Sequence, residues 1–225
     1  MDMAHNGLDI LIAALAHDGG LTNHLVGNTL FIHPDKVRQQ AAQMQSTRLS
    51  GKLPVRFSTE EYVYGYADGR RHKRLFKNRS EAVRCSETEN IHTTVRPGIR
   101  IMVDKDGNYW VRRAIRDYTG EIVSAGRIST IRNYMISHIW GNTADPCFFT
   151  SLWNIALTPL HCSFILDKPD DHHAEILHLK ELFKAICWEL YHPNGLWGEP
   201  LVVEPAAEMR AEARKFIDNK LLKFI

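Results

Sequence analysis

Two polar residues stand in a strongly apolar part of the sequence, the segment 137–168, which reads SHIWGNTADPCFFTSLWNIALTPLHCSFILDK. His138 follows a short apolar run, and Asn154 lies between Trp153 and Ile155. A neutral imidazole, whose pKa is near ~6.5, can take a proton from water around neutral pH. The carbonyl oxygen of an asparagine is a ligand that hard divalent cations accept. These two residue types could therefore support metal-assisted hydrolysis.

The same segment predicts elements that would bring these residues together. MISHIW has the pattern of a strand with His138 near its end, and GNTADP is typical of a turn-rich loop. WNIALTP indicates a second short strand closed by Pro159, and LHCSFILDK the start of a helix. The predicted order is strand, loop, strand, helix.

This order resembles the ββα-metal motif of the HNH, or His-Me finger, nuclease superfamily. The matching residues are S-H-I at 137–139, W-N-I-A-L-T-P at 153–159 and Lys168 on the expected helix, within a stretch of roughly thirty residues out of 225. The resemblance implies a metal-dependent endonuclease acting on DNA, with RNA not excluded, and a restriction or phage-defence enzyme is one setting for it. It makes His138 the general base and Asn154 a ligand of Mg²⁺ or Mn²⁺. A further catalytic cation that binds phosphate falls on Lys168, with Arg132 as the alternative.

Some positions depart from the family pattern. Ser137 stands where many members have an aspartate ligand, which favours a site that holds its metal largely through one asparagine. The third polar residue falls on Ser163, with His161 and Asp167 as alternatives. The paired Cys-x-x-Cys zinc supports of many members are absent from this sequence.

The candidate residues also have structural interpretations. His138 fits a core histidine with a satisfied hydrogen bond, and Asn154 fits a residue bonded to backbone at a turn. A zinc site built from Cys147, His161, Cys162 and a later histidine is a further alternative. The wide spacing of the four cysteines argues against a four-cysteine zinc knuckle and against a secreted disulfide framework.

Basic residues are concentrated locally, although the net charge is only +2. The run RRHKRLFKNR at 70–79 contains six Lys and Arg and no acid, and a second set of arginines lies within 96–132. A local basic field on a nearly neutral protein favours a surface that binds a polyanion. The predicted nucleic-acid contacts are Arg70, Arg71, Lys73, Arg74, Lys77, Arg79, Arg112, Arg116 and Arg132.

The remaining patterns predict an α+β fold, an antiparallel β meander flanked by helices. Helices are expected over 6–18 with a stop at Gly19-Gly20, over 34–50, within 170–195 and over 204–225, and a hairpin around Asp68-Gly69. IRIMV, YWVRRAI and EIVSAGRI, between residues 99 and 128, are expected to form the strands of the meander. Residues 1–55 would be an N-terminal helical region, and 56–225 would hold the basic sheet, the nuclease-like motif and the C-terminal helices, within one continuous domain or two.

The apolar run GLDILIAALAH near the N-terminus is interrupted by Asp9, and it fits neither a signal peptide nor a membrane span. We therefore expect a cytoplasmic protein without membrane contacts, for which a homodimer is compatible. Two functions of other classes compete with the nuclease. One is a non-catalytic nucleic-acid-binding or regulatory module in which 137–168 is a packed hairpin, and the other is a helical interaction protein.

Overall fold

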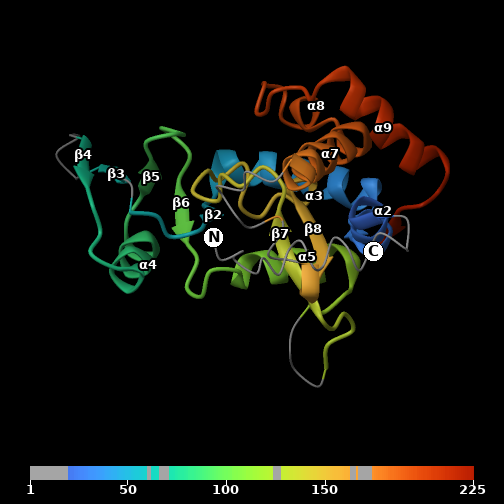
Figure 1. The fold of residues 1–225 in the computed structure, drawn as a ribbon. Helices are drawn as coiled ribbons and strands as arrows, with labels where there is room; N and C mark the ends of the chain where they lie inside the picture. Colours follow the sequence, from blue (N-terminus) through green and yellow to red (C-terminus); the bar gives the residue numbers. More distant parts are fainter. Residues whose placement is uncertain (1–19, 60–61, 66–70, 124–127, 163–165, 167–173) are drawn as a thin grey trace, which may run out of the picture.

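The computed structural model describes residues 20–59, 62–65, 71–123, 128–162, 166 and 174–225. The chain forms a larger and a smaller lobe that lie side by side (Figure 1). In chain order the described elements are α2 (Gly20–Asn28), β1 (Leu30–Phe31), α3 (Pro34–Ser50), β2 (Leu53–Val55), β3 (Tyr62–Gly65), β4 (Arg71–Arg74), α4 (Arg79–Thr88), β5 (Ile91–Thr93), β6 (Ile101–Val103), α5 (Tyr109–Thr119), β7 (Tyr134–His138), β8 (Ile155–Pro159), α7 (Ala174–Tyr191), α8 (Pro193–Trp197), α9 (Ala207–Asp218) and β9 (Lys223–Phe224). Two 3₁₀ turns, η2 (Leu152–Asn154) and η3 (Leu160–Cys162), precede and follow β8. The α+β class predicted from the sequence is confirmed.

The larger lobe is built on a sheet with the strand order β7–β8–β1–β9. Every residue of β8 is buried, which suits its position between two neighbouring strands. Strand β1 pairs antiparallel with β8 and parallel with β9, so strands from both ends of the chain meet in this sheet. Helices α2 and α3 contribute to the same hydrophobic core as β8 and α7, with Phe31 stacked on Phe183 at a ring-centroid distance of 5.8 Å.

The C-terminal helices pack as a pair at the top of the view in Figure 1. Glu189 of α7 accepts hydrogen bonds from Arg210 and Arg214 of α9, with the Arg214 Nε at 2.7 Å. Tyr191, at the end of α7, donates to the carbonyl of Ile32 at 2.8 Å and so fixes this helix to the N-terminal part of the lobe. The helices predicted over 34–50 and within 170–195 and 204–225 are all present, and α3 ends before Gly51 as expected.

The small lobe comprises β2 to β6 with α4 and lies to the left in Figure 1. Strand β3 is the centre of an antiparallel sheet in the order β4–β3–β5, and β2 pairs in parallel with β6. A separate hydrophobic cluster fills this lobe, in which Tyr62 of β3 packs against Phe76 beside α4. The hairpin predicted around Asp68-Gly69 is confirmed by its paired strands, while the turn itself lies outside the described residues.

The meander predicted between residues 99 and 128 is wrong. IRIMV forms β6, but YWVRRAI belongs to helix α5, because Val111 and Ile115 are buried one turn apart. Asp104, between β6 and α5, accepts hydrogen bonds from the backbone N–H groups of Gly107 and Trp110 at 2.7 and 2.8 Å and so caps this helix. The helix predicted over 6–18 lies outside the described residues.

Candidate functional site

The segment 137–168 is framed by an antiparallel strand pair. His138 is the last residue of β7 and lies opposite Ile155, the first residue of β8, while Tyr134 lies opposite Pro159. The predicted strand, loop and strand are therefore present. Asn154 differs from the prediction, because it ends the 3₁₀ turn η2 and does not belong to the strand.

His138 is held by the loop that connects the two strands. Its Nε2 is 3.0 Å from the carbonyl oxygen of Phe149, and its ring stacks on the Phe149 ring with an interplanar angle of 12°. A carbonyl can only accept, so Nε2 carries the proton and Nδ1 keeps a lone pair. Burial, with a contribution from the charge of Arg56, lowers the pKa of His138 to about 4, although the bond to Phe149 acts in the opposite direction. The ring is therefore a neutral, weak base of fixed tautomer at pH 7.

Asn154 clamps the same loop from inside the protein. Its side chain is fully buried, and its Oδ1 accepts a hydrogen bond from the backbone N–H of Trp140 at 2.8 Å. Its Nδ2 donates to the carbonyls of Gly141 and Phe148 at 3.2 and 3.1 Å. The predicted role of Asn154 as a metal ligand does not fit this environment, because its oxygen is engaged and shielded from solvent. The structural interpretation, a bond to backbone at a turn, fits it.

The other predicted members of the site do not join His138. His161 follows Pro159, so it lies at the end of the strand pair away from His138, and the five residue pairs between them span roughly 14 Å at ~3.4 Å per residue. Ser137 is buried with its hydroxyl 2.8 Å from that of Thr158. Ser163, Asp167 and Lys168 lie outside the described residues.

His161 instead meets His24 of α2 and Cys162 of η3. The potential ligand atoms of these three residues all lie within 4.8 Å of one another. Cys162 is buried, which raises the pKa of its thiol, whereas His161 is exposed. The zinc site considered from the sequence shares two of these residues. Cys147 does not belong to this group. No sequence pattern indicates His24 as a ligand, because only the pairing of β1 with β8 brings His24 close to His161 and Cys162.

The predicted nucleic-acid contacts separate into two regions. Arg112 and Arg116 lie on helix α5, where they form ion pairs with Asp106 and Asp117 at 2.7 and 3.1 Å. Arg132 donates through Nε to the carbonyl of Ser129 at 3.3 Å. The remaining contacts belong to the small lobe or its hairpin, and of these Arg70 lies outside the described residues. The sequence-predicted set is thus not one surface.

The small lobe carries basic residues on its sheet and around the start of α4. In β4 and β5, Lys73 and His92 both pair with Val63 of β3, so all three share the sheet face opposite to buried Tyr62. Arg71 pairs with Gly65 farther along the same strand. The side chains of Lys73, Lys77, Arg79 and Arg84 are exposed.

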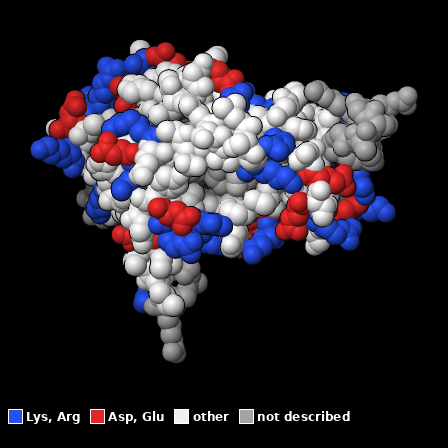
Figure 2. Space-filling model, turned by 180° about the vertical axis from the view of Figure 1, so that it is seen from behind, with Lys and Arg blue, Asp and Glu red and all other residues white. Residues whose placement is uncertain are grey.

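Acids compensate this charge only in part. Arg74 is paired with Glu81, whose pKa is lowered by the hydrogen bond from the backbone N–H of Lys77 and by the charge of Arg74. Within the described part of the chain, Lys77, Arg79 and Arg84 form no ion pair. Figure 2 shows one face of the molecule, on which Lys and Arg alternate with Asp and Glu and do not merge into one broad basic field.

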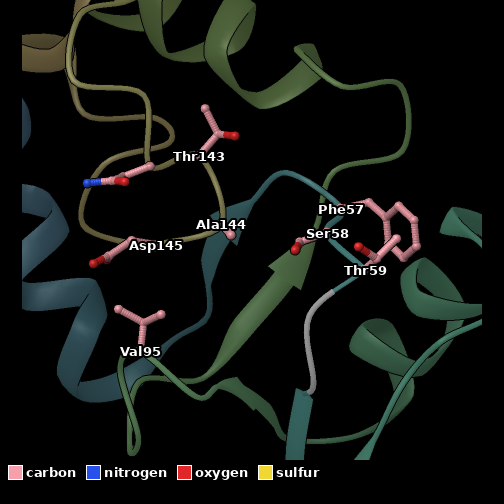
Figure 3. Close-up of a pocket in the computed structure, with 8 residues that line it drawn as sticks. Phe57, Ser58, Thr59, Val95, Thr143, Ala144 and Asp145 are labelled. Atoms are coloured by element: carbon pink, nitrogen blue, oxygen red, sulfur yellow. The ribbon is translucent and has the colours of Figure 1, made fainter. Parts of the chain in front are cut away.

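An open pocket of about 600 Å³ lies where the two lobes meet (Figure 3). It is lined by Phe57, Ser58, Thr59 and Val95 from the small-lobe side and by residues 142–145 from the loop after β7. Arg56 joins the two walls through a backbone bond to the carbonyl of Thr143 at 2.9 Å. The carboxylate of Asp145 is neutralised by Arg96 at 3.0 Å. This lining presents hydroxyl and amide groups and none of the residues predicted from the sequence.

Within the described residues, we find no helix that combines the length and apolar character needed to cross a lipid bilayer. No curated protein and no solved structure matches the chain. One family model does match, that of the family described as "Uncharacterised protein PM1201", over residues 32–223. Because this match covers most of the sequence, both lobes included, the chain belongs to the PM1201 family.

Proposed function

We propose that the protein binds nucleic acid and that the small lobe contacts its phosphate backbone. The observation that carries this proposal is the charge of residues 70–84, which contain seven Lys and Arg and a single acid, Glu81. That acid is already engaged by Arg74. Lys77, Arg79 and Arg84 form no ion pair within the described part of the chain, and such cations gain by releasing the counterions of a polyanion.

The shape of the small lobe supports the same function. Helix α4 supplies Ala82 and Cys85 to the core on one face of the β4–β3–β5 sheet, where Tyr62 and Ile91 are buried. The opposite face presents exposed Lys73 beside Val63. An antiparallel sheet of this width can enter a nucleic-acid groove while flanking Lys and Arg hold the phosphates.

Helix α5 provides the comparison that makes the proposal specific. Its Arg112, Arg113 and Arg116 match the small lobe in charge, but each is ion-paired with Asp106 or Asp117. Breaking these pairs would offset the gain from phosphate contacts. We therefore expect α5 to contribute little to binding.

The experiment compares two triple variants with the natural sequence. Binding of labelled duplex DNA and single-stranded RNA is measured by fluorescence anisotropy at several salt concentrations. For Lys77→Ala/Arg79→Ala/Arg84→Ala, the slope of log Kobs against log salt should fall by about 0.9 for each lost phosphate contact, up to about 2.7. Arg112→Ala/Arg113→Ala/Arg116→Ala should leave the slope unchanged. Binding without salt dependence, or an equal loss in both variants, would refute the assignment.

A second candidate function is hydrolysis of a phosphodiester with His138 as the base. The observation that favours it is the Phe149 carbonyl, which fixes the ring in one tautomer with a lone pair on Nδ1. Among the described residues, the group of His, Cys, Asp or Glu close enough to share an ion lies at the other end of the strand pair. A Mg²⁺ or Mn²⁺ ion beside His138 would therefore need ligands from substrate phosphate, water and residues beyond those described.

Supercoiled plasmid incubated with Mg²⁺, with Mn²⁺ or with EDTA tests this activity. Cleavage that requires the metal and is lost in His138→Ala, but is kept in the exposed control His33→Ala, would support hydrolysis. Salt-sensitive binding without cleavage under any metal would leave nucleic-acid binding as the function. Cleavage that persists in His138→Ala would exclude His138 as the base.

A further inference from the structure

The topology of the larger sheet brings His24 next to two potential ligand residues, His161 and Cys162, that are far from it in the sequence. Helix α2 leads directly into β1, and β8 leads directly into η3. Because β1 and β8 are antiparallel, with Leu30 opposite Leu157, the residues before β1 lie next to those after β8. His24 therefore faces His161 and Cys162 across this end of the sheet.

The distances fit a tetrahedral zinc ion. The Nε2 atoms of His24 and His161 are 3.3 Å apart, with the rings at 62° to each other. Two nitrogens bound to one Zn²⁺ at ~2.0–2.1 Å and a tetrahedral angle are about 3.3 Å apart. The Cys162 sulfur lies within 4.8 Å of a ring nitrogen of each histidine.

The burial of the three residues also suits a metal centre. Buried Cys162 lies in the protein interior, half-buried His24 comes from a helix packed on the core, and His161 is exposed. In such a centre the fold fixes two ligands, His24 and Cys162, while His161 lies at the surface. The metal ion can enter from the solvent on the side of His161. The two imidazoles and one thiolate form a donor set that selects Zn²⁺ over the hard cations Mg²⁺ and Ca²⁺.

We propose that His24, His161 and Cys162 bind one zinc ion, with a water molecule in the fourth position on the exposed side of His161. The ion links α2 to η3 and so fastens the N-terminal helix to the end of β8. The site lies at the opposite end of the β7–β8 pair from His138, so it is independent of the nucleic-acid and hydrolysis proposals. Three protein ligands and one open position also leave the ion able to polarise a bound water.

The test uses the full chain, stripped with a chelator and titrated with Zn²⁺ against a chromophoric competitor. One equivalent of zinc per chain is expected. His161→Ala changes an exposed residue and should fold normally, yet its zinc affinity should fall by at least the roughly 10–100-fold that even an outer-shell substitution costs. His24→Ala and Cys162→Ser should show losses of the same order. The matched controls His33→Ala, which is exposed, and Cys85→Ser, in the small lobe, should bind as the natural sequence does.

Cobalt substitution gives a second readout that does not depend on affinity. Co²⁺ bound by the natural sequence should show the visible bands of a tetrahedral ion and a thiolate charge-transfer band, and Cys162→Ser should lose the latter. Three outcomes would overturn the proposal. These are no stoichiometric zinc binding by the natural sequence, equal affinity in His161→Ala and the controls, and a cobalt spectrum without a thiolate band.

Discussion

Replacing Asn154 by alanine should destabilise the protein severely, because this fully buried side chain bonds three backbone groups. The substitution removes the amide that bonds Trp140 N–H and the carbonyls of Gly141 and Phe148. A net contribution of ~1 kcal/mol for each of the three bonds gives about 3 kcal/mol, and leaving the buried Phe148 carbonyl without a partner adds about 1 kcal/mol. We therefore expect a loss of about 3–4 kcal/mol in the free energy of unfolding.

Urea unfolding in the presence of EDTA measures this loss without any contribution from a bound cation. The midpoint should fall at constant m-value, and the melting temperature should fall by about 6–16 °C for a chain of this size. Asn90→Ala is the matched control, because this asparagine is exposed, and it should change stability by less than about 0.5 kcal/mol.

The variant Asn154→Asp distinguishes two roles of this residue, the hydrogen bonding that holds the loop and the binding of a metal ion. Aspartate keeps an acceptor for Trp140 but replaces the donor that faces two carbonyl oxygens, so this variant should also be destabilised. If Asn154 were a metal ligand, aspartate would bind the cation at least as well and the metal-free protein would be little affected. An unfolding free energy of Asn154→Ala within about 0.5 kcal/mol of the natural sequence in EDTA would refute the clamp.

Three further predictions concern buried polar groups. Gln40→Ala should lower the free energy of unfolding by about 2–3 kcal/mol in urea melts, because this buried side chain bonds Thr150 O at 2.6 Å and Leu152 N at 2.8 Å, while exposed Gln39→Ala should have little effect. Asp104→Ala should cost about 2–4 kcal/mol and reduce the helical circular dichroism, since it removes the cap of α5; an unchanged spectrum and midpoint would contradict this. His138 has a pKa lowered to about 4 by burial, so the unfolded chain, with an ordinary pKa near ~6.5, binds the extra proton between these values. Stability should therefore fall by up to about 3 kcal/mol as the pH falls from 6.5 to 4, and urea midpoints at pH 7 and 4.5 should show a smaller fall for His138→Gln.

Local patterns predicted three of the seven described helices, α3, α7 and α9, and the β7–β8 pair. The apolar period of α7 and the Pro34 start of α3 are visible in the sequence, because they follow from neighbouring residues. The sequence predicts a strand where helix α5 forms, because aromatic and β-branched residues such as Trp110, Val111 and Ile115 are common in strands. The four-residue spacing of Val111 and Ile115, with Asp104 ahead of them, was the signal that distinguishes the two.

The site depends on pairings between distant residues, which a single sequence does not show. The pattern marked His138 and Asn154 as unusual, and both are tied to the connecting loop. Whether an asparagine uses its oxygen for a metal or for a backbone N–H depends on which loop folds over it. The meeting of His24 with His161 depends on the register of β1 against β8, which no local pattern around His24 indicates.

The position of β1 in the sheet determines the order in which the protein can fold. Phe31 pairs with Ala156 on one side and with Phe224 on the other, so both neighbours of this strand are made long after it. Contacts of such high sequence separation slow folding, and during synthesis they leave the edges of β1 without partners. The small lobe, whose strands come from one continuous stretch, can form first. The N-terminal helices complete their packing only when β8 and β9 are available, so we expect this half of the protein to become ordered after the small lobe.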